Sequence, residues 1–85
     1  MDKCVRELYE GDGAIGSKYL LTIYEDGTLK LTWYHMDTCI EEENPVLIPA
    51  GKGLRIQYGS NNCRSSIGFS KYSDGSLDKR WTKIK

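Results

Sequence analysis

The chain has little that would staple it, anchor it in a membrane or activate a substrate. Its 85 residues include three cysteines, two prolines and one histidine. An odd cysteine count argues against a fully disulfide-stapled secreted domain, and no apolar run is long enough to cross a membrane. Polar Asp2 and Lys3 follow Met1 where a signal peptide would turn apolar. We therefore expect a cytoplasmic protein with reduced thiols and no membrane contact.

Sequence motifs for catalysis and for metal binding are also missing. His35 lies four residues before Cys39, but a Cys–His nucleophile pair needs the thiol within hydrogen-bond reach of the imidazole. Positions i and i+4 of a strand are too far apart for that contact. The cysteines Cys4, Cys39 and Cys63 lack the short paired spacing of zinc ligands, and no nucleophile elbow or phosphate loop occurs. We expect no enzymatic activity, no metal and no cofactor.

What the chain does contain is a ten-residue pattern that occurs twice. The segments 24–33 (YEDGTLKLTW) and 72–81 (YSDGSLDKRW) share Tyr, Asp, Gly, Leu and Trp, and the only two tryptophans of the chain end them. Two copies of one hairpin unit explain this better than chance does. The glycine-rich composition with many Tyr, Thr and Ser also favours an all-β fold with tight turns.

The first Asp-Gly pair predicts a hairpin whose register follows from its apolar pattern. A three-residue turn with a left-handed Gly27 pairs Ile23 with Leu29 and Leu21 with Leu31. One face is then wholly apolar or aromatic, whereas a two-residue turn would mix the faces. The same register in the second copy places Ile67 opposite Trp81, although Lys71 and Lys79 then fall on the apolar face near the turn.

A third strand is expected before each hairpin, because residues 5–9 align loosely with residues 54–58. The prediction is a single domain, residues 1–85, with an internal repeat at 5–36 and 54–84. Two related three-stranded meanders would form a small barrel or sandwich of about six strands. Residues 2–10 also fit a short helix capped by Asp2.

The two copies of the repeat are expected to share one core, and the segment between them is expected to add a strand or a plug. Val46, Leu47 and Ile48, between Pro45 and Pro49, predict a short edge strand or a plug over a barrel end. The predicted core consists of apolar residues from both copies: Leu21, Ile23, Leu29, Leu31, Trp33, Ile56, Ile67, Phe69, Leu77 and Trp81.

The net charge of zero conceals two halves of opposite sign. Residues 1–43 carry ten acidic and four basic side chains, a net of −6, and residues 44–85 carry two acidic and eight basic ones, a net of +6. A small chain without catalytic groups but with divided charge suits a binding protein that acts on a protein partner as inhibitor or adaptor. The predicted site is acidic: Glu10, Asp12, Asp37, Glu41, Glu42 and Glu43. The opposite charges also allow two copies to pair as a homodimer.

Two alternative functions remain open. A basic patch in the second half (Arg64, Lys79, Arg80 and Lys83), interleaved with Phe69, Tyr72 and Trp81, is typical of nucleic-acid binding. The two Asp-Gly-Thr/Ser-Leu hairpins resemble those of the cyanovirin-type lectins, which implies a carbohydrate-binding module. That resemblance covers the two turns alone, the paired disulfides of the family have no counterpart in three cysteines, and no binding residue is carried over from it.

Overall fold

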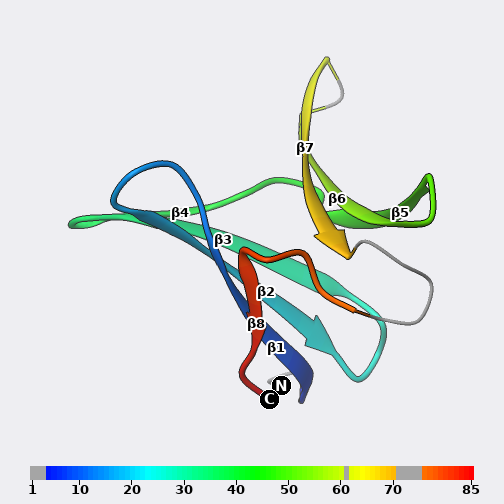
Figure 1. Cartoon of the computed structure of the whole chain (residues 1–85). Helices are drawn as coiled ribbons and strands as arrows, with labels where there is room; N and C mark the ends of the chain where they lie inside the picture. Colours follow the sequence, from blue (N-terminus) through cyan, green and yellow to red (C-terminus); the bar gives the residue numbers. More distant parts are fainter. Residues whose placement is uncertain (1–3, 61, 71–75) are drawn as a thin grey trace.

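In the computed structural model, which describes residues 4–60, 62–70 and 76–85, the chain forms two antiparallel sheets (Figure 1). The strands are β1 (Val5–Asp12), β2 (Ser17–Tyr24), β3 (Leu29–His35), β4 (Thr38–Glu41), β5 (Val46–Ala50), β6 (Gly53–Ser60), β7 (Cys63–Ser70) and β8 (Trp81–Lys83). The predicted all-β class is confirmed, with eight strands rather than about six. The N-terminal segment is a strand from Val5 onward, so the helical alternative is wrong for residues 5–10.

The first hairpin has the predicted register. Ile23 pairs with Leu29, Leu21 with Leu31 and Tyr19 with Trp33 across β2 and β3. Together with β1, which pairs with β2, these strands form the predicted first meander. The apolar residues therefore share one face of the sheet, as the alternation of the sequence requires.

The turn of this hairpin shows why the register holds. Gly27 has a φ of 89°, which a glycine adopts without a steric penalty. The Tyr24 N–H donates to the Thr28 carbonyl oxygen at 2.9 Å and the Gly27 N–H donates to the Tyr24 carbonyl oxygen at 3.0 Å. The Asp26 carboxylate accepts hydrogen bonds from the Thr28 amide and hydroxyl, so the Asp-Gly-Thr sequence closes the turn on itself.

The second copy does not repeat this hairpin, and its predicted register is wrong. Ile67 pairs with Ile56 of β6, whereas Trp81 begins β8, which pairs with β1 in the other sheet. The turn residues 71–75, Lys71 included, lie outside the described residues. Near this turn the two arms are linked by an isolated bridge between Ser70 and Leu77 and by a hydrogen bond from the Asp78 N–H to the Phe69 carbonyl oxygen at 3.1 Å. The second three-stranded unit is therefore β5-β6-β7, and the crossover places β8 beside β1.

The indole of Trp81 explains this change of sheet. Its Nε1–H donates to the Gly68 carbonyl oxygen of β7 at 2.7 Å, while its ring packs against Gly11 of β1, where a side chain would collide with it. Trp81 is 4% exposed and meets the Phe69 ring at a centroid distance of 5.3 Å. One buried tryptophan thus joins the two sheets, and aromatic side chains of this size contribute strongly to a core.

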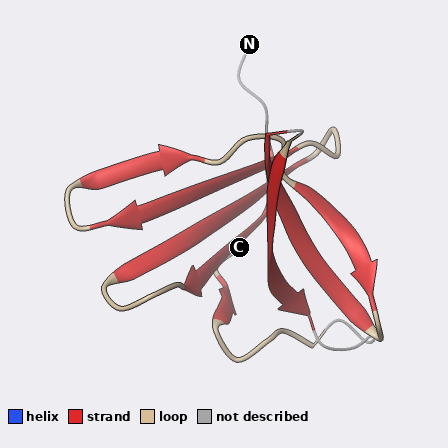
Figure 2. Cartoon of the chain, turned by 90° about the horizontal axis from the view of Figure 1, so that it is seen from above, coloured by secondary structure: helices blue, strands red, loops and turns tan. Residues whose placement is uncertain are grey.

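The core cluster draws residues from both sheets. In Figure 1 the three-stranded sheet lies at the upper right of the five-stranded one, and in Figure 2 the strands fan out in different directions. Of the predicted core residues, six are buried: Leu21, Ile23, Leu31, Ile56, Phe69 and Trp81. Leu29, Ile67 and Leu77 are partly buried against them, and Trp33 lies outside this cluster, stacked on His35 at 5.7 Å. Tyr9 is buried against Phe69 and was not predicted.

The region between the two predicted copies also takes a defined form. Val46, Leu47 and Ile48 belong to β5, which is an edge strand of the three-stranded sheet, as the flanking prolines predicted. Residues 38–41 form β4, an edge strand of the five-stranded sheet that the sequence analysis did not identify. The described part of the chain contains no helix long and apolar enough to cross a membrane.

Candidate functional site

The structure divides the six predicted acidic residues into two groups. Glu10 and Asp12 lie on β1, whereas Asp37, Glu41, Glu42 and Glu43 lie within or beside β4. The strand order β4-β3-β2-β1-β8 puts two strands between the groups. At a spacing of about 4.8 Å between neighbouring strands, β1 and β4 are about 14 Å apart. The predicted single acidic surface is therefore two separate surfaces.

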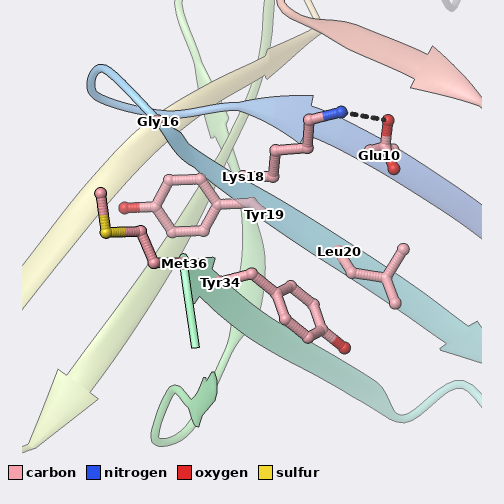
Figure 3. Close-up of a pocket in the computed structure, with 7 residues that line it drawn as sticks. All are labelled: Glu10, Gly16, Lys18, Tyr19, Leu20, Tyr34 and Met36. Carbon is pink, nitrogen blue, oxygen red and sulfur yellow. Dashed lines mark hydrogen bonds and ion pairs between the residues drawn. The ribbon is translucent and has the colours of Figure 1, made fainter. Parts of the chain in front are cut away.

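Glu10, from the first group, borders a cleft on the outer face of the five-stranded sheet. Glu10 accepts an ion-pair contact from Lys18 at 3.5 Å, and both side chains are about half exposed. The cleft, of about 380 Å³, continues past Lys18 toward Tyr34 and Met36 (Figure 3). An exposed pair of this kind contributes little to stability, and the Lys18 ammonium beside Glu10 offsets its negative charge at this surface.

The second group surrounds a strand that is open along its length. All four residues of β4 are exposed, among them Ile40 at 46%. In the described part of the chain β4 pairs with β3 alone. We name residues 37–43, with four acidic and no basic side chains, the acidic edge.

The ladder between β3 and β4 shows which backbone groups of the acidic edge face outward. The Glu42 N–H donates to the Leu31 carbonyl oxygen at 2.8 Å, which makes this pair a hydrogen-bonded one. Because bonded and non-bonded pairs alternate in an antiparallel ladder, Cys39 and Glu41 belong to non-bonded pairs. Their amide and carbonyl groups point away from β3, toward a site where another strand would pair.

The end of the acidic edge is held in place by the second sheet. The Gly59 N–H of β6 donates to the Glu43 carbonyl oxygen at 2.7 Å, and Arg64 donates to the Asn44 carbonyl oxygen at 2.9 Å. Burial of Glu42, helped by the neighbouring Glu43 charge, raises the pKa of the Glu42 carboxyl above its usual value. Glu41 lies 3.8 Å from Lys30, again as an exposed pair. The acidic edge is thus a fixed part of the fold rather than a free loop.

The predicted basic patch also separates into two parts. Arg64 is half-buried, and its guanidinium donates to the carbonyl oxygens of Gly59, Asn44 and Gln57. This side chain ties the β6–β7 hairpin to the segment after β4, and its donors are used within the fold. Arg64 therefore contributes to the scaffold through three hydrogen bonds within the fold.

The remaining basic residues flank β8. We name residues 79–85 the basic edge, because they carry Lys79, Arg80, Lys83 and Lys85 and no acidic side chain. Lys83 lies 3.8 Å from Glu7, and Arg80 lies 3.6 Å from Asp78. Of the aromatic residues expected to stack on bases, Phe69 and Trp81 are buried in the core, and Tyr72 lies outside the described residues.

The structure also places the residues considered for catalysis, metal binding and carbohydrate binding. His35 shares a face with Trp33, while Cys39 pairs with Tyr34, so the imidazole and the thiol lie on opposite faces of the sheet. The three cysteines are free and exposed. No group of three or more His, Cys, Asp or Glu among the described residues is arranged to hold a metal ion. Asp26 closes its own turn, and the second Asp-Gly turn lies outside the described residues.

Sequence reasoning found the acidic residues through their charge but missed the open backbone of Cys39 and Glu41. The turn before β4 has a φ of 53° at Met36, a conformation that is uncommon for a residue other than glycine, so the sequence gives little indication of this strand. No protein-family model, curated protein or solved structure matches the chain.

Proposed function

We propose that this chain is a small non-catalytic binding protein that acts on a protein partner as an inhibitor or adaptor. It would hold an extended, basic segment of that partner against the acidic edge. The observation that supports this proposal is the state of β4: an edge strand, exposed over all four residues, with outward backbone groups at Cys39 and Glu41. The three exposed thiols fit action in the reducing cytosol.

The physical basis is the addition of a strand to an open sheet edge. Cys39 and Glu41 offer two donors and two acceptors to an incoming strand, and each net hydrogen bond contributes about 0.5–1.5 kcal/mol. The acidic side chains favour a partner of positive charge and raise its association rate more than they add affinity. Ile40, which is 46% exposed, supplies an apolar contact between the charged residues.

The proposal is tested with a fluorescein-labelled ten-residue peptide of alternating lysine and threonine. Fluorescence anisotropy at low salt should show binding that weakens as salt is added, and the glutamate–threonine counterpart should not bind. Glu41→Lys with Glu43→Lys should weaken binding of the lysine peptide about tenfold or more. The matched control reverses the same charge on β1, with Glu10→Lys and Asp12→Lys, and should retain most of the affinity.

A second variant separates backbone pairing from charge. Cys39→Pro removes an outward N–H that the β3–β4 ladder does not use, so the fold should persist while peptide binding falls. Cys39→Ser is its control and should bind as the native chain does. Equal losses from the acidic-edge and β1 reversals, or unchanged binding by Cys39→Pro, would mean that the edge of β4 is not the binding site.

A further inference from the structure

The five-stranded sheet ends in two edges of opposite charge. β4 lies at one end of the strand order and β8 at the other. The acidic edge carries a net of −4 and the basic edge a net of +4. The division of charge between the two halves of the sequence thus becomes a division between the two ends of a single sheet.

The basic edge also presents backbone groups for pairing. The Asp12 N–H donates to the Arg80 carbonyl oxygen at 2.9 Å, and the Ile84 N–H donates to the Leu8 carbonyl oxygen at 2.7 Å. The alternation of the ladder then places Lys83 in a non-bonded pair with Tyr9, with its amide and carbonyl directed away from β1. In the described part of the chain β8 pairs with β1 alone.

We infer that the acidic edge of one copy of this chain takes the basic edge of a second copy. This inference rests on the proposed function, because it names the basic strand that the acidic edge accepts. Pairing of β4 with β4, or of β8 with β8, would set like charges against each other, whereas β4 with β8 brings −4 against +4. The two surfaces differ, so the association is head-to-tail and can continue beyond a dimer.

The short edges set the character of this association. β4 has four residues and β8 has three, so few hydrogen bonds form at each contact. Short edge strands are a known restraint on sheet-to-sheet aggregation. The association is therefore reversible and dependent on concentration, and salt weakens it because exposed charges are screened over about 10 Å at 0.1 M salt and about 3 Å at 1 M salt. Self-association also covers acidic edges and so competes with a foreign partner for the same strand.

The experiment is sedimentation velocity in a reducing buffer, over a concentration series, at about 50 mM and about 500 mM salt. The native chain should associate at low salt and dissociate at high salt. The variant Glu41→Lys/Glu43→Lys loses its acidic edge and the variant Lys79→Glu/Lys85→Glu loses its basic edge. Each alone should weaken association about tenfold or more.

Mixing the two variants gives the decisive result. The mixture contains one intact acidic edge and one intact basic edge, so it should form a one-to-one heterodimer and stop there. Glu25→Lys and Lys52→Glu, which reverse exposed charges in turns away from both edges, should associate as the native chain does. Circular dichroism of each variant confirms that the fold persists.

The outcomes distinguish this inference from the proposed function. A native chain that stays monomeric but binds the lysine–threonine peptide overturns the self-association and leaves the acidic edge as a binding site. A chain that neither associates nor binds the peptide overturns both. Variants that still associate alone, or a mixture that stays monomeric, would also overturn the head-to-tail contact.

Discussion

Replacing Gly11 with alanine tests the contact that brings β8 back to the five-stranded sheet. A Cβ atom at this position would lie 2.7 Å from Trp81 Cδ2 and 2.8 Å from Cε2 and Cε3. Carbon atoms pack best at about 3.5–4.0 Å, so the indole must move by about 1 Å. Such a shift strains the hydrogen bond from Trp81 to Gly68 and the packing against Phe69.

The size of the effect follows from comparison with a matched glycine. Overpacking a core costs about 1–3 kcal/mol, while a compatible glycine-to-alanine change gains about 0.4–1 kcal/mol by restricting the unfolded chain. At Gly68 an added Cβ meets its nearest atoms at 3.6 and 3.9 Å, which is ordinary contact. Gly68→Ala should therefore stabilise the protein, and Gly11→Ala should be about 1–3 kcal/mol less stable than Gly68→Ala.

Thermal unfolding followed by circular dichroism measures this difference. For a domain of this size each kcal/mol shifts Tm by about 4–8 °C, so the two variants should differ by about 4 to 24 °C. The total stability of an 85-residue domain is about 4–13 kcal/mol, so both variants should still fold at room temperature. If the Tm of Gly11→Ala equals or exceeds that of the native chain while the Tm of Gly68→Ala is lower, the packing of Trp81 on Gly11 is wrong.

Three further predictions concern acid dependence and the scaffold arginine. The Tyr9 hydroxyl donates to the Glu7 carboxylate at 2.5 Å, and this hydrogen bond is the main cause of the lowered Glu7 pKa. Ionised Glu7 therefore stabilises the fold above about pH 4.5, and this stability is lost as the pH falls below that value. Glu7→Gln should lose less stability than the native chain below that pH in urea titrations. Burial of Glu42, and then the neighbouring Glu43 charge, raises the pKa of the Glu42 carboxyl. The protonated carboxyl therefore favours the folded state below about pH 4.5, and this contribution to the free energy of unfolding is lost as the pH rises. Glu42→Gln should have a higher urea midpoint than the native chain at pH 7 and the same midpoint at pH 3. Arg64→Ala removes three hydrogen bonds to backbone carbonyls and should cost about 1.5–3 kcal/mol in urea unfolding, whereas unchanged stability would place this side chain outside the scaffold.

The first hairpin was predictable because its determinants are local. Gly27 supplies the left-handed residue of the turn, and the alternation from Tyr19 to Trp33 leaves one register with a wholly apolar face. Neighbouring residues thus agree with the tertiary structure, which is the condition under which a sequence pattern is reliable. The edge position of β5 was predictable for the same reason, since Pro45 and Pro49 flank its apolar residues.

The path of the second copy was not predictable from its pattern. The repeat indicates a second hairpin, yet that register places Lys71 and Lys79 on the apolar face, which was a sign of conflict in the sequence. In the structure Lys79 lies exposed in the turn before β8, and Trp81 reaches the core from β1's side. The room that Gly11 leaves for an indole 70 positions away is a tertiary property that no local pattern reports.

The same crossover determines what the charge division of the sequence means. If residues 79–85 had continued the β7 hairpin, the basic side chains would lie in the three-stranded sheet, in a different layer from β4. Because Trp81 docks on Gly11, β8 becomes the far edge of the sheet that begins with β4. The acidic charges of the first half of the sequence and the basic charges of the second half then lie at opposite edges of the five-stranded sheet. The proposed association between copies therefore depends on the anchoring of Trp81 as much as on the charges, since an unanchored β8 has no fixed edge to offer.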